Sequence, residues 1–231
     1  MNELVNEILK RYQQPFMVIG VTGSVSVGKS TFANNLASLL HQENLTASVI
    51  STDDFMMSND TLLAAGIFEQ KGFPQTYDLD RMATVIRDFK AGREQIEIPL
   101  YTQELADIHP TQVQTITRPN ILIVEGVTAL RLPEDVLDFK IFVTADLVNI
   151  KSWYLSRTLQ ETALAKNDPS SWRYQYAKMP LDELSDLVMK VWDTTNQTNL
   201  DHYILPTKSL ADVIVTLNDQ HDVKNITYNN R

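Results

Sequence analysis

Residues 23–31, with the sequence Gly-Ser-Val-Ser-Val-Gly-Lys-Ser-Thr, constrain the fold of this chain more than any other segment. They follow an apolar run at residues 16–21, which predicts a buried strand, and they precede apolar residues at helical spacing. The latter are Phe32, Leu36, Leu39 and Leu40. A strand, the pattern G-x-x-x-x-G-K-[ST] and a helix, in this order, are typical of a P-loop. The segment therefore predicts a site for the phosphates of a nucleotide.

The residues of this loop have different predicted roles. The glycines let successive backbone N–H groups point at a phosphate chain, and the positive end of the following helix strengthens that field. Lys29 is expected to reach the β- and γ-phosphates of ATP, and the Ser30 hydroxyl is expected to bind Mg²⁺. The predicted nucleotide-binding residues of the loop are Gly23, Ser24, Val25, Ser26, Val27, Gly28, Lys29, Ser30 and Thr31.

Two further acidic residues follow predicted strands. Asp53 comes directly after the strand at residues 47–51, and Glu125 ends the apolar run that starts at residue 121. Ligands bind beyond the carboxyl ends of strands in open α/β sheets, which is where both side chains are placed. Glu125 is in the position of a Walker-B acid, which reaches Mg²⁺ together with the P-loop serine. We therefore expect Ser30 and Glu125 to hold the metal and Asp53 to be functional.

Predicted strands and helices alternate along the chain. Helices are expected at residues 1–14, 79–90 and 181–192, and another after the N-cap candidate Asp146. Strands are expected at 16–21, 47–51, 121–126, 140–144 and 211–217, with a weaker strand pair at 96–102 and 111–117. This alternation predicts an α/β fold of the P-loop type, a mostly parallel sheet with helices on both faces. No repeat or linker divides the chain, so we expect a single domain over residues 1–231.

Composition restricts the partners. The net charge of −9 argues against nucleic acid and anionic membranes, because both require clustered Lys and Arg. Cysteine is absent, and none of the four histidines has a partner at metal-binding spacing. No apolar run reaches the length of a membrane helix, and Glu3 and Glu7 lie where a signal peptide would be basic and then apolar. We expect a cytoplasmic protein with a small-molecule substrate.

The class of P-loop protein can be narrowed further. A GTPase would carry an N/T-K-x-D segment late in the chain, and Thr-Lys-Ser-Leu at residues 207–210 does not match it. The chain is short for a helicase or a transport ATPase and acidic for work on nucleic acid. A small-molecule kinase is the remaining interpretation.

Several short segments resemble type I pantothenate kinases, in the phosphoribulokinase/uridine kinase group. Lys-Gly-Phe-Pro at 71–74 and Leu-Pro-Thr at 205–207 are more restricted than the P-loop itself. The other matching segments are 23–31, 51–53, 77–78, 99–101, 121–126, 154 with 157, 168–169 and 176–178. The resemblance covers nearly all of residues 16–223. It implies an ATP- and Mg²⁺-dependent transfer of the γ-phosphoryl group to a primary hydroxyl, from pantothenate to 4'-phosphopantothenate, by a homodimer.

The resemblance also implies roles for single residues. Asp53 matches the general base of the family, and Lys29 and Arg157 match the groups that stabilise the transferring phosphoryl. Arg157 is expected to close over the site late, which keeps water out. His221 aligns with a residue near the adenine.

On the acceptor side, the resemblance places pantothenate against Tyr101, Tyr154 and Asn196. The family has Tyr-Ser-His where this chain reads Tyr-Thr-Gln at 101–103, so Gln103 stands in place of an imidazole that grips substrate and the inhibitor coenzyme A. Feedback by coenzyme A is therefore not implied for this chain.

Other positions depart from the family pattern. Asn34 replaces an arginine, and Asp54 replaces a glycine beside Asp53. Repulsion between the two acids is expected to raise one pKa, unless Asp54 points to solvent. Thr158, Glu161 and Arg173 replace aromatic residues, so the apolar pocket for the far end of the acceptor is expected to be lost. The long segment that family members carry ahead of the P-loop has no counterpart in this sequence.

Three functional hypotheses follow. The first is pantothenate kinase activity. The second, motivated by Gln103, Asn34 and the lost aromatics, is a kinase for another small hydroxyl compound, either a nucleoside such as uridine or cytidine or a sugar acid such as glycerate. The third is a non-catalytic ATP-binding regulator, which has no need of a base such as Asp53.

Overall fold

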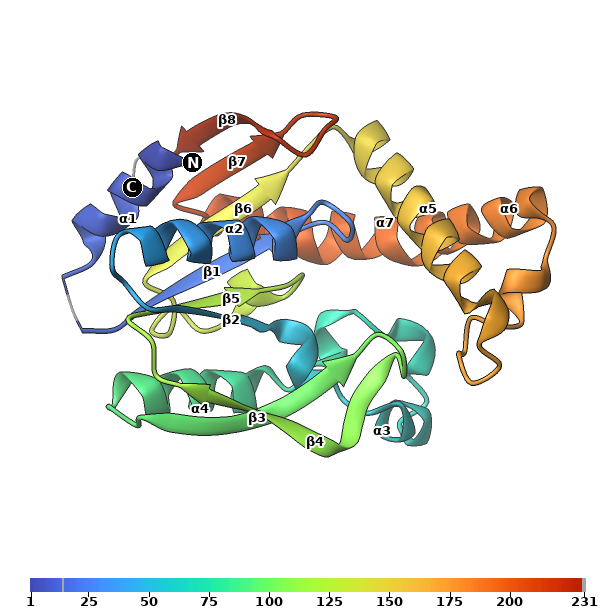
Figure 1. The fold of residues 1–231 in the computed structure, drawn as a ribbon, viewed down its shortest axis with the longest axis horizontal. Helices are drawn as coiled ribbons and strands as arrows, with labels where there is room; N and C mark the ends of the chain where they lie inside the picture. Colours follow the sequence, from blue (N-terminus) through green and yellow to red (C-terminus); the bar gives the residue numbers. More distant parts are fainter. Residues whose placement is uncertain (14, 230–231) are drawn as a thin grey trace.

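A central sheet organises the computed structural model, which describes residues 1–13 and 15–229 (Figure 1). Within these residues its six strands lie in the order β2-β5-β1-β6-β7-β8. They are β1 Met17–Gly23, β2 Ala47–Ser51, β5 Ile121–Glu125, β6 Phe139–Thr144, β7 Val213–Leu217 and β8 Val223–Tyr228. Neighbouring strands are parallel except for β7 and β8, which pair antiparallel. The predicted α/β fold with a mostly parallel sheet is confirmed.

Helices cover both faces of the sheet, and the side chains of β1 show how. Met17, Ile19 and Val21 pack with α1 (Asn2–Arg11) and α2 (Lys29–Gln42). Val18 points to the other face and packs with α4 (Leu79–Lys90). Successive side chains of a strand alternate between faces, so an uninterrupted apolar run serves two cores.

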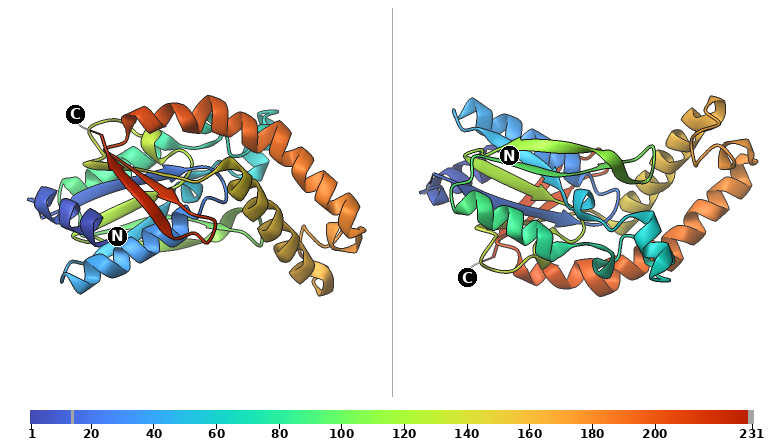
Figure 2. Two further views of the ribbon diagram at one scale, coloured as in Figure 1. Left: turned by 90° about the horizontal axis from the view of Figure 1, so that it is seen from above. Right: turned by 90° about the horizontal axis from the view of Figure 1, so that it is seen from below.

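Two helices form an arm that extends beyond the sheet. In both views of Figure 2, α5 (Leu147–Leu164) and α6 (Leu181–Val191) run outward together, joined by the segment 165–180. We call these two helices and their connection the arm. From α6 the helical path returns along the sheet through π-helical turns and α7 (Gln197–Asn199) to Leu210. Trp192 is fully buried and packs against Tyr154, with 5.2 Å between the two ring centroids. This contact holds the base of α5 against the helical path that follows α6.

Three local predictions need correction. The strand pair is longer than expected, with β3 at Gln95–Thr102 and β4 at Asp107–Thr117. Strand β8 was not predicted, because its polar residues alternate too weakly to mark a half-buried strand. Asp146 does precede α5, but its carboxylate makes no capping hydrogen bond among the described residues.

A short helix, α3 (Asn59–Ala64), lies between β2 and α4 in the chain. Among the described residues, no helix combines the length and the apolar character needed to cross a bilayer.

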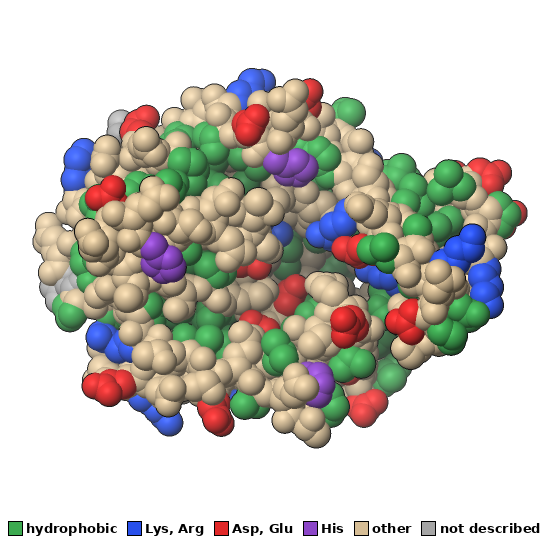
Figure 3. All heavy atoms as spheres, viewed as in Figure 1, with side chains coloured by type: hydrophobic (Ala, Val, Ile, Leu, Met, Phe, Trp, Pro, Cys, Tyr) green, Lys and Arg blue, Asp and Glu red, His purple; other side chains and the backbone are tan. Residues whose placement is uncertain are grey.

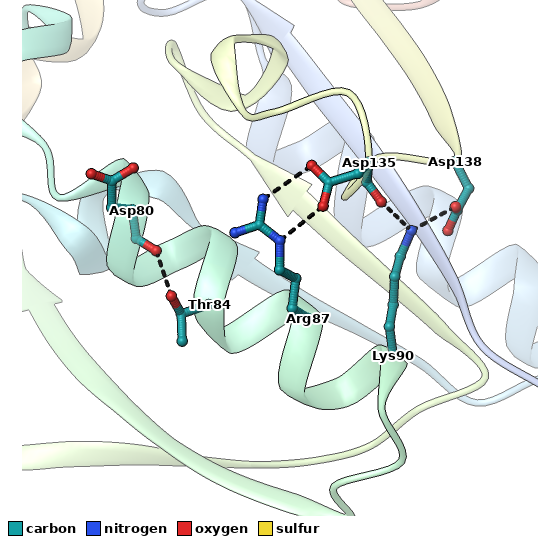
Figure 4. Close-up of polar contacts among 6 residues, drawn as sticks. All are labelled: Asp80, Thr84, Arg87, Lys90, Asp135 and Asp138. Atoms are coloured by element: carbon teal, nitrogen blue, oxygen red, sulfur yellow. Dashed lines mark hydrogen bonds and ion pairs between the residues drawn. The ribbon is translucent and has the colours of Figure 1, made fainter.

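Ion pairs fasten the last turns of α4 to the loop before β6 (Figure 4). Arg87 binds Asp135 through two hydrogen bonds of 2.8 and 3.0 Å, and Lys90 Nζ binds Asp138 Oδ1 at 2.8 Å. The other oxygen of Asp138 accepts the N–H of Val18 at 2.8 Å. Exposed pairs are worth about 1 kcal/mol or less, so the apolar core positions α4 and these pairs orient the loop.

The first helix should be needed for stability, because Ile8 is fully buried against the sheet. Replacing Ile8 with Ala should lower the free energy of unfolding by about 2–5 kcal/mol through lost transfer energy and a residual cavity. Urea denaturation measures this change. Leu63→Ala, at a position 60% exposed, is the matched control and should cost about 0.5 kcal/mol or less. Equal losses in the two variants would contradict the docking of α1.

Candidate active site

The P-loop connects β1 to α2 through backbone geometry that requires glycine. Gly28, the residue before α2, has φ +92°, a left-handed conformation that side chains rarely adopt. A Cβ atom on Gly23 would collide with the carbonyl oxygen of Val143 on the neighbouring strand. The loop therefore turns tightly enough to direct its N–H groups into one concave site.

Strand register brings the predicted metal and base residues to this loop. Glu125 is the register partner of both Val21 on β1 and Ser51 on β2. Ser30 Oγ donates a hydrogen bond of 2.9 Å to Glu125 Oε1. Asp53 lies in the turn that follows β2, so it reaches the same edge of the sheet. The structure thus assembles Ser30, Glu125 and Asp53 beside the P-loop, where they were expected.

Lys29 lies half-buried near these acids. Its ammonium donates to the carbonyl oxygen of Ser24 at 2.8 Å. Burial lowers the pKa of Lys29, and the charges of Glu125 and Asp53 oppose that shift. Burial raises the pKa of both Asp53 and Glu125, and in each the charge of Lys29 is the largest opposing influence. In each of the three groups, burial favours the neutral form and the opposite charges of the neighbours oppose that shift in pKa.

Two residues that the sequence analysis gave no role surround Asp53. Tyr77 donates its hydroxyl to Asp53 Oδ1 at 3.1 Å, and its own pKa is raised by burial and by the Asp53 charge. Lys71 binds Asn59 Oδ1 at 2.6 Å and the carbonyl of Ala106. Its charge also lowers the pKa of Asp53. Both lie in segments that carried the family resemblance, which was the available signal.

A cavity of about 590 Å³ opens beside the P-loop, and we call it the P-loop cavity. Its lining includes Ser26, Gly28, Lys29, Ser30, Thr31, Trp153, Arg157 and His221. The Trp153 and His221 rings stack at 3.7 Å between centroids, with the His221 ring against Gly28. Among the described residues, the buried hydroxyls of Ser24 and Ser26 have no hydrogen-bond partner. Unpaired donors around a phosphate-binding turn fit a bound nucleotide, and the carboxylate and hydroxyl of Glu125 and Ser30 fit Mg²⁺.

The remaining P-loop residues contribute backbone. Val27 is fully buried in the core. Val25 is partly buried and packs against the apolar cores on both faces of the sheet. The sequence analysis gave Trp153 no role, although it adjoins Tyr154, which was predicted to bind the acceptor.

A second cavity, of about 330 Å³, lies within the arm, and we call it the arm cavity. Gln103 and Tyr154, two of the four residues predicted to bind the acceptor, line it. Tyr101 and Asn196 are not part of the lining. Tyr101 instead lies 5.5 Å under the Lys71 ammonium, and Asn196 forms a hydrogen bond that opposes the burial-induced rise in the pKa of Tyr154.

An apolar cavity is present even though Thr158, Glu161 and Arg173 stand where the family has aromatic residues. The walls of the arm cavity are mostly apolar, but the apolar side chains come from other positions. They are Trp172, Tyr176, Leu184, Leu187, Val188 and Val191, from the connecting segment and from α6.

Arg157 lines both cavities. Its Nε lies 3.7 Å from Glu161 Oε1, one turn along α5, and its side chain is 54% exposed. In Figure 3 a hollow is visible where the arm leaves the body of the molecule, with basic and acidic side chains around it. Arg157 is therefore placed to act between the two cavities.

Comparison with known proteins agrees with this geometry. The model of the phosphoribulokinase/uridine kinase family matches residues 18–161. A pantothenate kinase of Streptococcus pneumoniae (strain P1031) is 38% identical over 222 residues, which are 92% of this chain and 72% of the relative.

The chain belongs to the phosphoribulokinase/uridine kinase family.

Solved structures show the same fold in this kinase. D-glycerate 3-kinase from Cryptococcus neoformans matches with a TM-score of 0.62 at 14% identity, covering 98% of each chain. A possible uridine kinase from Bacillus stearothermophilus matches with a TM-score of 0.54 at 17% identity, covering 84% of this chain and 94% of the other. At such identities the likeness concerns the fold alone. Family membership, together with the P-loop, makes this chain an ATP-dependent kinase.

Asp54 has a structural position in this kinase that the sequence analysis did not describe, although the expected repulsion from Asp53 does contribute to a raised pKa. The side chain is buried and does not point to solvent. Its two oxygens accept the N–H of Ser51 at 3.2 Å and that of Tyr101 at 3.0 Å. Burial is the main cause of its raised pKa, and the charge of Asp53 is the smallest of the causes. Asp54 therefore ties the turn that carries Asp53 to strand β3, which carries Tyr101.

Asp54→Ala should lower the free energy of unfolding by about 2 kcal/mol or more, because two backbone N–H groups lose their acceptor. Asp54→Asn retains an acceptor oxygen and should cost less. Chemical denaturation at neutral pH measures both, with the exposed Asp60→Ala as control. An Ala variant as stable as the parent would show that Asp54 does not tie these segments together.

Proposed function

We propose that this kinase transfers the γ-phosphoryl group of ATP to the primary hydroxyl of pantothenate, giving 4'-phosphopantothenate. The observation that carries the proposal is the cluster of Lys29 with Asp53 and Glu125 at the strand ends beside the P-loop. A regulator that only binds ATP would gain nothing from a half-buried Asp53 there, because partial burial raises the free energy of its charged form. Phosphoryl transfer needs a carboxylate at this position to accept the proton of the acceptor hydroxyl.

On the nucleotide side, the residues fit Mg²⁺ and ATP. Ser30 and Glu125 would hold the metal, which neutralises phosphate charge when bound. The backbone of residues 23–31 would bind the phosphates, and the stacked Trp153 and His221 rings offer a flat surface for the adenine.

Asp53 is proposed as the general base. It would accept the proton of the acceptor hydroxyl as that oxygen attacks the phosphorus. The Tyr77 hydroxyl holds Oδ1, which leaves Oδ2 of Asp53 for the acceptor. Lys29 and Arg157 would stabilise the negative charge on the transferring phosphoryl oxygens, which is the larger contribution in such reactions.

The acceptor assignment rests on the 38% identical pantothenate kinase and on the cavity within the arm. Gln103 and Tyr154 would contact pantothenate from the lining, and the predicted contacts with Tyr101 and Asn196 would come from outside it. From the resemblance to type I pantothenate kinases we further propose a single domain over residues 1–231, a homodimer and a cytoplasmic location.

The direct test is ADP release with Mg²⁺ and ATP, measured in parallel with pantothenate, uridine, cytidine and glycerate. The proposal predicts turnover with pantothenate well above that with the other three. Turnover with a nucleoside or with glycerate, but not with pantothenate, would refute the acceptor and retain the phosphoryl transfer.

Asp53→Asn should leave the affinity for ATP nearly unchanged and lower turnover about a hundredfold or more, because the amide cannot accept the proton. Calorimetric ATP binding and steady-state turnover measure the two effects. Asp60→Asn, which changes an exposed acid, is the control. Unchanged turnover in Asp53→Asn would remove Asp53 as the base.

The pH dependence should reveal the Tyr77 hydrogen bond. Asp53 must be ionised to act, so kcat/KM should fall as the pH drops through its pKa, which lies above the usual aspartate value. The Tyr77 hydrogen bond lowers that pKa, so Tyr77→Phe should raise it and move the acidic limb to higher pH. Tyr228→Phe removes a hydroxyl that has no partner among the described residues and should leave the limb in place. An unmoved limb in Tyr77→Phe would contradict the assignment.

A further inference from the structure

An ion pair interrupts the apolar wall of the arm cavity. Arg173 Nη2 donates to Glu161 Oε2 at 2.6 Å, and both residues line the cavity. The Arg173 guanidinium also lies 4.3 Å over the Trp172 ring. With 16% of its side chain exposed, Arg173 is held in one place by an acid and an aromatic face.

The charges of the cavity do not cancel. Its charged lining residues are Arg157, Glu161 and Arg173. Glu161 pairs with both guanidinium groups, at 3.7 Å from Arg157 and 2.6 Å from Arg173. Two positive charges therefore share one negative charge, and a net positive charge remains in a largely apolar space.

Arg173 has more N–H donors than its hydrogen bond to Glu161 uses. A guanidinium carries five N–H groups, and among the described residues the one side-chain hydrogen bond of Arg173 is that to Glu161. The positive charge of Arg173 also opposes the burial-induced rise in the pKa of Tyr101 and of Tyr154. The guanidinium therefore lies within electrostatic range of both tyrosines assigned to the acceptor.

We infer that Arg173 is a specificity residue that binds a carboxylate at the end of the acceptor remote from the reacting hydroxyl. The inference rests on the proposed function and states which class of acceptor the site selects, namely hydroxy acids. A planar guanidinium matches the geometry of a carboxylate, and a partly desolvated cation attracts an anion more strongly than a neutral group. Pantothenate and glycerate meet this requirement, whereas uridine and cytidine do not.

The same arrangement disfavours neutral analogues of the acid. An amide in place of the carboxylate cannot neutralise the surplus charge, and one of its two polar groups is a donor that faces other donors. Glu161 keeps the guanidinium in place, so the selectivity is built into the wall of the cavity.

The test compares pantothenate with its neutral primary amide as acceptors, in the parent and in Arg173→Met and Arg173→Lys. In the parent we expect kcat/KM to be higher for the acid. Arg173→Met should raise KM for the acid about tenfold or more with little change in kcat, and should leave KM for the amide nearly unchanged. Arg173→Lys should recover part of the preference. Lys178→Met is the matched control, because Lys178 stacks on Tyr174 in the same segment but does not line the cavity.

Each outcome discriminates. An acid-to-amide ratio that is the same in the parent and in Arg173→Met would overturn the inference while leaving pantothenate kinase activity intact. Turnover with glycerate and none with pantothenate would refute the proposed acceptor and support the hydroxy-acid class. If no acceptor is phosphorylated, the proposed function fails, and calorimetric binding of pantothenate and its amide decides the inference. Acid binding that does not depend on Arg173 overturns it.

Discussion

The electrostatic attraction between the half-buried ammonium of Lys29 and the carboxylates of Asp53 and Glu125 is the interaction on which this site depends. A charge removed from water needs opposite charges close by, and here the parallel strands supply them, because their carboxyl ends meet at one edge. The same three charges perform different tasks. In the proposed mechanism Lys29 binds phosphate, Glu125 accepts the Ser30 hydroxyl beside the metal, and Asp53 serves the acceptor. Loss of one member would leave the other charges uncompensated, so the cluster behaves as a unit.

The parts of the site that could be predicted from sequence are those controlled by strand ends and by one loop. The P-loop pattern, with Asp53 and Glu125 directly after apolar runs, was sufficient because the parallel register fixes where the carboxyl ends meet. The alternation of strands and helices similarly predicted the sheet and its two covered faces. The edge strand β8 was not predicted. One of its faces is exposed, and its polar residues obscure the alternation of apolar and polar side chains that marks a strand.

Contacts between distant segments could not be predicted. Asp54 reads as a surface acid beside another acid, and only the approach of β3 shows that it accepts the N–H of Tyr101. The stacking of Trp153 on His221 joins α5 to the turn before β8, and the apolar wall of the arm cavity combines α6 with the segment 165–180. A family pattern compared position by position misses such a wall, because its apolar side chains come from positions outside that pattern.

The central claim is that Lys29 binds the phosphates and stabilises the transferring group in this cluster. The most direct measurement is the affinity for Mg²⁺ and ATP, together with turnover, in Lys29→Ala, with Lys10→Ala, at a 75% exposed side chain, as control. The account predicts that Lys29→Ala weakens nucleotide binding and also lowers turnover, while Lys10→Ala changes neither. Normal nucleotide affinity and turnover in Lys29→Ala would contradict the P-loop assignment and the mechanism built on it.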